Sequence, residues 1–305
     1  MAFYSPDPAM AQTLADLVRA LELDGRPGLA QQLSLTWVRF GRSLLESAAE
    51  GASTALGGRG ASWGGDRPRY PASVVKLVYL VAAEAWLQQG LIEDDPELRR
   101  ALDLMIRDSS NDATGLVVDL LTGTTSGPAL PPERMALWVE QRQLVNQWLV
   151  SLDWPELQGL NVCQKTWGDG PFGRERVFYG PEQENRNRLS TDATARLLEG
   201  VMASVLISPP ACRRMQSLLA RSLDPGERAA DPENQVDGFL GEGLAQGARL
   251  WSKAGWMSQA RHDAAYVELE GQDPLLLVVF TEGAACARDT TLLPEIARHL
   301  STFGV

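Results

Sequence analysis

The most constraining feature of the sequence is residues 70–83, YPASVVKLVYLVAA, in which Lys76 is the only charged residue. An apolar run with no polar face indicates a helix that is buried on all sides, and we expect such a helix over residues 73–89. A lysine ammonium is rarely buried, because its removal from water costs free energy. The position of Lys76 therefore has to be explained by its chemistry.

The composition limits the classes of partner that the chain can bind. The net charge of −11 and the pI of about 4.8 argue against nucleic acid and anionic membranes, since both require a basic surface. No apolar run is long enough to span a bilayer, and the three cysteines have no metal-ligand spacing, so we expect no metal. The first residues lack the regions of a signal peptide. The sequence as written thus predicts a cytoplasmic protein, or a periplasmic or secreted one whose leader has been removed.

Strand-like segments lie at both ends of the sequence, and helical patterns lie between them. Residues 33–40 predict a strand, residues 54–71 a short strand and a long loop, and the C-terminal part an antiparallel meander over 248–257, 263–271 and 274–284. The N-terminal residues predict an amphipathic helix with Leu14, Leu17, Val18 and Leu21 on one face. Further helices are expected over 95–108, 110–121, 131–152, 190–206, 208–223 and 291–303.

This order predicts an α+β protein in which both chain ends build one sheet. We expect a sheet lobe from residues 1–69 and 226–305, a helical lobe from residues 70–225, and the active site in the cleft between them. Residues 161–188 have no clear period, and a loop of this length inside a compact chain is usually functional.

Ser73 and Lys76 are one helical turn apart on the same face of the expected helix. A serine hydroxyl is a poor nucleophile until a base takes its proton, and a lysine in an apolar site can be that base near neutral pH. Only three of the 28 basic residues are lysines, and only lysine readily loses its proton. The alternative is structural: Ser73 caps the helix and Lys76 extends to the surface.

Three short motifs follow one another along the chain. They are S-x-x-K at Ser73–Lys76, S-x-N at Ser109–Asn111, and K-x-G at Lys253–Gly255. The product of their expected chance matches is roughly 0.02, before order and context are required. Together they resemble the motifs of serine β-lactamases and penicillin-binding proteins, and are closest to those of class A β-lactamase-like proteins.

The resemblance implies a β-lactamase/transpeptidase-like fold, with a five-stranded antiparallel sheet flanked by helices and an all-helical lobe. It also implies a serine acyl hydrolase that works without a cofactor and opens β-lactam rings through an acyl-enzyme. Its substrate would be a small molecule or peptide that carries a carboxylate, of the β-lactam or D-Ala-D-Ala type.

The family's functional residues carry over to the matching positions of this chain. Ser73 would be the nucleophile and Lys76 its base, Ser109 would pass a proton to the leaving nitrogen, and Asn111 would position Lys76 and hold the substrate amide. Lys253 would lower the proton affinity of Lys76 and attract the substrate carboxylate. The backbone N–H groups of Ser73 and Trp256, beside Gly255, would form the oxyanion hole, and Arg261 would bind the carboxylate or else be a solvated surface arginine.

The chain departs from the family pattern at several positions. Ala254 replaces the Thr or Ser of K-T-G, which puts affinity for ordinary penicillins in doubt, and Ser110 replaces an Asp. Only 36 positions separate Ser73 from Ser109. Glu175 lies at about the position of the deacylating glutamate of class A enzymes, but Glu182 or Glu184 fits almost as well, and an exposed loop carboxylate is the alternative.

Other functions remain open from the sequence. A D,D-peptidase acting on peptidoglycan would share the acylation chemistry, and a non-catalytic sensor or a glutaminase would share the fold. Gly60–Gly64 matches the G-x-S-x-G nucleophile elbow around Ser62, with His262 and His299 downstream, but a loop rather than a helix follows it.

Overall fold

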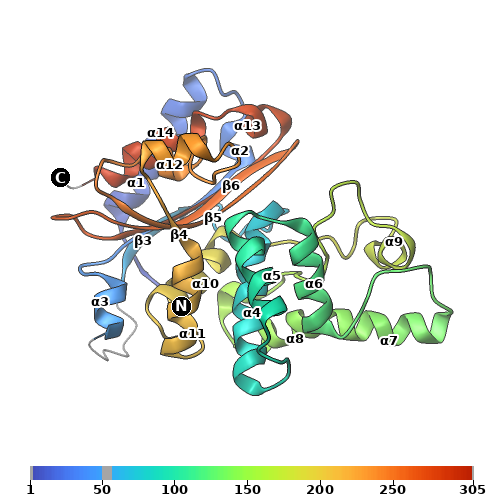
Figure 1. Cartoon of the computed structure of the whole chain (residues 1–305). Coiled ribbons are helices and arrows are strands. Elements are labelled where there is room, and N and C mark those ends of the chain that lie inside the picture. Colours follow the sequence, from blue (N-terminus) through green and yellow to red (C-terminus); the bar gives the residue numbers. More distant parts are fainter. Residues whose placement is uncertain (1–2, 50–56, 304–305) are drawn as a thin grey trace.

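A sheet built from both ends of the chain separates two layers of helices (Figure 1). In this computed structural model, which describes residues 3–49 and 57–303, the seven strands lie in the order β1-β3-β2-β7-β6-β5-β4. Five of them are longer, and each of these pairs antiparallel with the next one in the sheet: β2 (Leu33–Arg39), β3 (Arg59–Trp63), β5 (Arg249–Met257), β6 (Ala260–Glu268) and β7 (Leu275–Glu282).

The predicted α+β fold is confirmed, but the strand number of five is wrong. Two strands of two residues each, β1 (Ser5–Pro6) and β4 (Ala220–Arg221), extend the sheet at its edges, and β1 runs parallel to β3. Strands this short contain too few residues for a periodic pattern, so the sequence gives no signal for them. β4 also falls within residues 70–225, which we assigned to the helical lobe.

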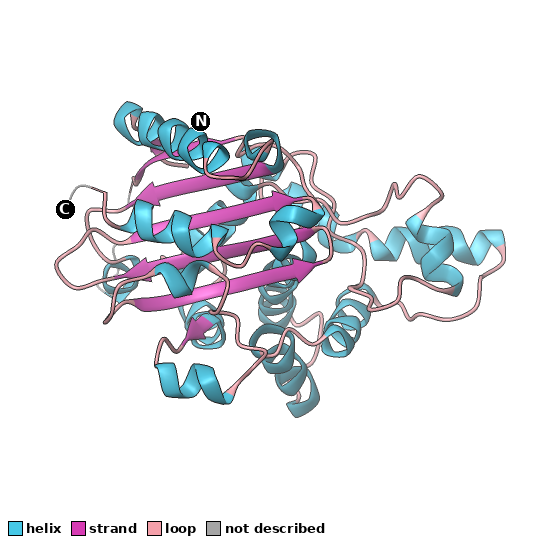
Figure 2. Cartoon of the chain, turned by 90° about the horizontal axis from the view of Figure 1, so that it is seen from above, coloured by secondary structure: helices cyan, strands magenta, loops and turns pink. Residues whose placement is uncertain are grey.

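Helices cover both faces of the sheet (Figures 1 and 2). Along β7, Leu275, Leu277 and Val279 face one buried cluster, while Leu276 and Val278 face the other. The first cluster is completed by α1 (Pro8–Leu23) and α14 (Leu292–Ser301) from the two ends of the chain. A strand that is buried on both faces needs apolar residues at successive positions, which explains the apolar run Leu275–Phe280 of β7.

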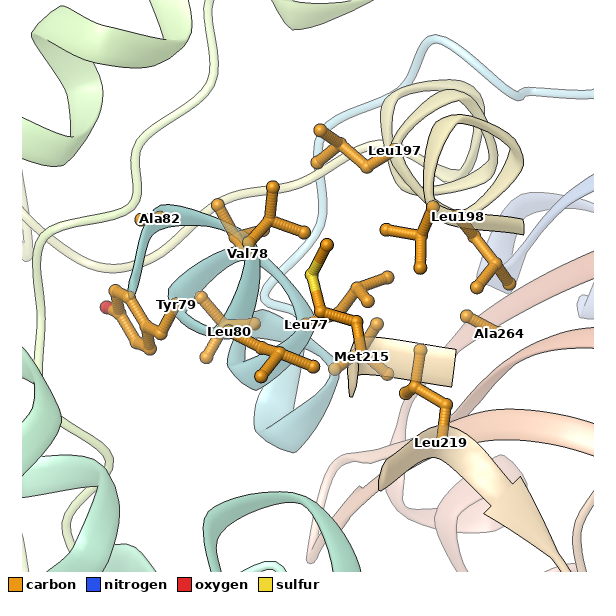
Figure 3. Close-up of a cluster of buried hydrophobic side chains, with 14 of the residues drawn as sticks. Leu77, Val78, Tyr79, Leu80, Ala82, Leu197, Leu198, Met215, Leu219 and Ala264 are labelled. Atoms are coloured by element: carbon orange, nitrogen blue, oxygen red, sulfur yellow. The ribbon is translucent and has the colours of Figure 1, made fainter. Parts of the chain in front are cut away.

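The second cluster surrounds the expected buried helix. A 3₁₀ turn, η1 (Ala72–Val74), leads into α4 (Val75–Gln89), and α4 is buried from Val75 to Trp86. Figure 3 shows Leu77 and Val78 of α4 with Leu198 and Met215 of two neighbouring helices. These helices are α10 (Thr191–Met202) and α11 (Pro209–Leu219).

The other helices agree with the predictions in part. α5 (Pro96–Arg107) and α6 (Asn111–Thr122) are as expected, and the side chains of Asp95 and Ser110 cap them. The prediction of a single helix over 131–152 is wrong. The chain forms two helices there, which are interrupted at Gln143, where ψ is −1°. Six short elements were not predicted from the sequence: α2 (Leu29–Gln32), α9 (Gly173–Tyr179) within the predicted loop, α12 (Pro225–Ala230), α13 (Ala284–Arg288), η2 (Pro155–Leu157) and η3 (Leu240–Gly243).

Three further elements complete the chain. The break at Gln143 divides α7 (Pro132–Arg142) from α8 (Leu144–Ser151), and α3 (Leu44–Ala49) follows β2. Residues 54–56 of the segment predicted as a short strand and loop lie outside the described residues, and its strand is β3. None of the helices described is long and apolar enough to cross a membrane.

The packing around α4 predicts a measurable difference between two leucines. Leu198→Ala removes a side chain that is 1% exposed, and we expect it to lower the free energy of unfolding by about 2–5 kcal/mol. Leu137→Ala on α7 removes one that is 59% exposed, and its effect should stay within about 0.5 kcal/mol. Urea unfolding of both variants measures this, and equal effects would contradict the described core.

Candidate active site

A cavity of about 460 Å³ contains most of the residues that the sequence motifs single out. It lies where η1, the connection between α5 and α6, the segment 231–239 and the end of β5 meet. Its lining comprises Ser73, Asp108, Ser109, Asn111, Pro232, Glu233, Asn234, Gln235, Asp237, Phe239, Ala254, Gly255, Trp256 and Arg261. The three motifs, which are separated by up to 180 positions in the sequence, therefore reach one site (73 to 253).

Ser73 lies at the start of the buried helix, and its hydroxyl is not used for helix capping. Within residues 3–49 and 57–303 this hydroxyl makes no hydrogen bond, and neither η1 nor α4 has a side-chain cap. The capping alternative for Ser73 is therefore wrong. The preceding residue, Ala72, has a φ of 46°, a left-handed conformation that residues other than glycine rarely adopt. Such backbone strain is often found at functional sites.

Gly255 allows β5 to lie directly against the backbone of Ser73. A Cβ atom on Gly255 would lie 2.9 Å from the backbone nitrogens of Ser73 and Val74, and 3.0 Å from the carbonyl oxygen of Pro71. These contacts are with backbone atoms, which cannot move aside as a flexible side chain can. Glycine is therefore required for this approach of strand and helix start.

Lys76 is fully buried, so the alternative in which it extends to the surface is wrong. Its Nζ donates to the backbone carbonyl of Ser109 and to Asn111 Oδ1 at 2.9 Å, and it lies 3.1 Å from Ser109 Oγ. In the described part of the chain it forms no ion pair. Burial lowers the pKa of Lys76 from 10.5 to about 7. Its neutral amine is therefore accessible near neutral pH.

The hydroxyl of Ser109 lies between two buried lysines. Lys253 Nζ is 3.1 Å from Ser109 Oγ, the same distance as Lys76 Nζ, and it also donates to the carbonyl of Ala254 at 2.7 Å. Burial, and then the charges of Arg221 and Lys76, hold the pKa of Lys253 well below its usual value. For Lys76 the cause is burial rather than the charge of Lys253 that the sequence analysis invoked.

Arg261 and Trp256 are fixed by the same backbone carbonyl at one side of the cavity. Arg261 Nε and Trp256 Nε1 each donate to the oxygen of Ala287 at 3.0 Å. Arg261 is only 8% exposed, so the alternative of a solvated surface arginine is wrong. Its guanidinium lies 4.9 Å from the ring centre of Phe239 and has no ion-pair partner among the described residues. An anion in the cavity could therefore bind it.

Glu175 lies on α9 and is not part of the cavity lining. Its carboxylate accepts hydrogen bonds from Arg142 at 2.5 Å and Ser126 at 2.8 Å, and it is 1% exposed, so it is not an exposed loop carboxylate either. Glu182 and Glu184 are exposed and also lie outside the lining. The carboxylates that do line the cavity are Asp108, Glu233 and Asp237.

Two residues that the sequence analysis missed hold the motifs together. Gln235 accepts a hydrogen bond from Lys253, and the guanidinium of Arg221 donates to the carbonyls of Ile106 and Ser252. Neither belongs to a motif, and their contacts span more than 100 sequence positions to the end of α5. No short-range pattern could have indicated them.

The nucleophile elbow around Ser62 does not form. Ser62 lies within β3, and a turn rather than a helix follows it. His262 Nδ1 accepts from the backbone N–H of Thr281, which leaves Nε2 to donate to the carbonyl of Tyr70 at 2.8 Å. Burial lowers the pKa of His262 to about 4, so it is a neutral structural residue. His299 lies on α14, among the helices that cover the other face of the sheet.

Comparison with known proteins decides the family. The model of the family described as "Beta-lactamase enzyme family" matches residues 87–303, which is more than half of the chain. The chain belongs to this beta-lactamase family. The matched residues include Ser109, Asn111 and Lys253, while Ser73 and Lys76 precede them. No curated protein matches the chain.

Solved structures of this family share the fold over nearly the whole chain. PBP-A is 17% identical with a TM-score of 0.62, and the match covers 98% of this chain and 96% of PBP-A. A beta-lactamase from Sphaerobacter thermophilus is 18% identical with a TM-score of 0.62, over 95% and 94% of the two chains. A beta-lactamase from Burkholderia vietnamiensis is 14% identical with a TM-score of 0.62, over 97% of each. The fold of this beta-lactamase family member is thus shared from end to end.

The contact at Gly255 leads to a prediction on stability. Gly255→Ala places a methyl group within 3.0 Å of three backbone atoms, and we expect it to lower the free energy of unfolding by about 1–3 kcal/mol. Gly41→Ala, where a Cβ meets nothing within 4 Å, serves as the matched control and should change it by less than about 0.5 kcal/mol. Denaturant titration compares them. An equally small effect at Gly255 would show that β5 and η1 are not in contact.

Proposed function

We propose that the protein is a serine acyl hydrolase of the class A β-lactamase type, which opens β-lactam rings by acylation of Ser73. The observation that carries this proposal is the environment of Lys76. Its amine is fully buried, has no carboxylate partner among the described residues, and is hydrogen-bonded to the S-x-N motif one turn from Ser73. A base with these properties is what a serine nucleophile requires.

The hydrogen bonds of Lys76 fit a neutral amine. A neutral amine has two N–H groups and one lone pair, whereas an ammonium has three N–H groups. The carbonyl of Ser109 and Asn111 Oδ1 can only accept, so they take both N–H groups. The lone pair is then left for a hydroxyl, and in the presence of substrate this would be the hydroxyl of Ser73.

Acylation follows from this arrangement. Lys76 takes the proton of the Ser73 hydroxyl while Oγ forms a bond to the carbonyl carbon of the lactam. The backbone N–H groups of Ser73 and Trp256 stabilise the oxyanion, and the close approach at Gly255 brings these two segments together. When the C–N bond breaks, Ser109 gives its proton to the nitrogen and receives one from Lys76. Lys76 is then neutral again, and the acyl group remains on Ser73.

The positive groups around the cavity suit a substrate that carries a carboxylate. Lys253 and Arg261 both lack a carboxylate partner within the described residues, so a substrate anion would not have to displace one. Ala254 cannot supply the hydroxyl of the K-T-G motif. We therefore expect weaker binding of penicillins than in enzymes that have this hydroxyl, with Arg261 as the main anion partner.

The fate of the acyl-enzyme separates two candidate functions. Glu175 lies outside the cavity lining, and Arg142 and Ser126 bind Oε1 of its carboxylate, so Glu175 is not placed to activate a water in the cavity. This position of Glu175 favours a slowly deacylating D,D-peptidase on peptidoglycan peptides as the second candidate. A similar protein, the PBP-A mutant solved as an acyl-enzyme complex with penicillin-G, is 17% identical to this chain.

A single experiment distinguishes the candidates. The protein is incubated with a chromogenic cephalosporin, and colour and intact mass are followed alongside Ser73→Ala. Steady turnover that Ser73→Ala abolishes supports the β-lactamase, while a lasting mass adduct without turnover supports the peptidase. If no β-lactam gives either turnover or adduct, the protein is a sensor or another hydrolase, and the proposed function is wrong.

The pKa of Lys76 predicts the pH dependence of acylation. The reactive form is the neutral amine, which becomes populated as the pH rises through about 7. The acylation rate constant should therefore increase about tenfold per pH unit below pH 7 and level off above it. Stopped-flow measurements at several pH values test this profile.

The variant Lys76→Arg tests the same role. An arginine keeps the positive charge but cannot lose its proton, so we expect the acylation rate constant to fall by at least about 100-fold. The conservative variant Arg19→Lys at the exposed end of a surface pair serves as the control and should acylate normally. Acylation of Lys76→Arg at the normal rate would exclude Lys76 as the base.

A further inference from the structure

Gln235 is hydrogen-bonded both to the predicted catalytic residue Lys253 and to the end of α5. It lies in the segment between α12 and η3, borders the cavity, and is 7% exposed. Its amide nitrogen donates to the carbonyls of Ile106 at 3.0 Å and Arg107 at 2.6 Å, and its amide oxygen accepts from Lys253 Nζ. Both ends of the amide are therefore engaged, and they connect Lys253 of the K-x-G motif to the end of α5, which leads into the S-x-N motif.

The nitrogen end of Gln235 holds the last turn of α5. The carbonyls of Ile106 and Arg107 are among the last ones of this helix, and such carbonyls have no partner within the helix. Only Asp108 separates Arg107 from Ser109. Ser109 has a φ of 55°, an uncommon conformation that the surrounding structure must maintain. A firm helix end is thus needed to keep the Ser109 hydroxyl between the two lysines.

The oxygen end of Gln235 fixes Lys253 without adding a negative charge. The charged groups that act on Lys253 are Arg221 on β4, Lys76 on α4 and the buried Asp263 on β6. A carboxylate in place of the amide oxygen would form an ion pair with Lys253 and stabilise its ammonium form. The neutral amide orients Lys253 toward Ser109 but leaves its charge free for a substrate anion.

We propose that Gln235 is a positioning residue that sets the Lys76–Ser109–Lys253 arrangement from both sides. This inference rests on the proposed function, because the arrangement matters only if Ser109 passes protons during acylation. Gln235 itself does not contact the reacting atoms. It acts through Lys253 and through the end of α5.

The chain contains a matched control for this role. Gln216 on α11 is 9% exposed, and its amide nitrogen also donates to two consecutive helical carbonyls, those of Val201 at 2.8 Å and Met202 at 3.2 Å. These contacts belong to α10 and lie outside the cavity lining. Gln216→Ala therefore removes a similar buried amide without touching the predicted site.

The kinetic test compares Gln235→Ala with Gln216→Ala. We expect Gln235→Ala to lower the acylation rate constant by about 10–100-fold, because Ser109 loses its position, while Gln216→Ala keeps most of the parental rate. Thermal unfolding of both variants shows whether they lose stability to a similar extent. An unchanged acylation rate in a folded Gln235→Ala variant would overturn the inference.

A second test does not depend on any β-lactam. Because the chain has only three lysines, selective ¹³C labelling at the lysine Cε gives three NMR signals, of which Lys165 outside the cluster is the reference. We expect Gln235→Glu to raise the pKa of Lys253 by at least about one unit relative to the parent. An unchanged titration would show that residue 235 does not contact Lys253. If Lys253 responds but the parent is never acylated, the contact is real and the proposed function is wrong.

Discussion

The hydroxyl of Ser109, held at 3.1 Å from both Lys76 and Lys253, is the contact on which the rest of the site depends. Both lysines are fully buried, and among the described residues neither forms an ion pair. Carbonyl and amide oxygens accept their hydrogen bonds instead. Because no carboxylate stabilises the buried ammonium forms, the pKa values of both lysines are lowered. A carboxylate beside Lys76 would keep it protonated and useless as a base. Asp108, Glu233 and Asp237 line the same cavity, but none of them forms an ion pair with either lysine.

The fold supplies this contact from three distant parts of the sequence. α4 is central because apolar side chains surround it, and this position carries Lys76 into the interior and Ser73 to the edge of the cavity. β5 reaches the same point because Gly255 lets two backbones approach within a distance that no other residue allows. The S-x-N segment comes directly after the end of α5. Gln235 and Arg221 donate hydrogen bonds to this helix end and so connect it to β5 and its neighbours.

Local sequence patterns predicted most of the helices and strands, because the formation of these elements depends largely on residues that are close in the sequence. The buried helix, the meander and the helices expected over 95–108 and 110–121 can all be read from spacing and residue type. The two short edge strands, the break at Gln143 and the helix around Glu175 could not, because they depend on contacts made after folding. The same holds within the site: motif residues were recognisable, whereas Gln235 and the partner of Glu175 are known only from long-range geometry. That the lysines bind neutral acceptors was equally invisible in the sequence.

The most direct test of the account is a crystal structure of the protein after reaction with a β-lactam. We expect continuous density from Ser73 Oγ to the former lactam carbonyl carbon, with the carbonyl oxygen between the N–H groups of Ser73 and Trp256. Ser109 should face the released nitrogen, with Lys76 and Lys253 on either side. An acyl group on another residue, or an intact ring bound away from Ser73, would contradict it.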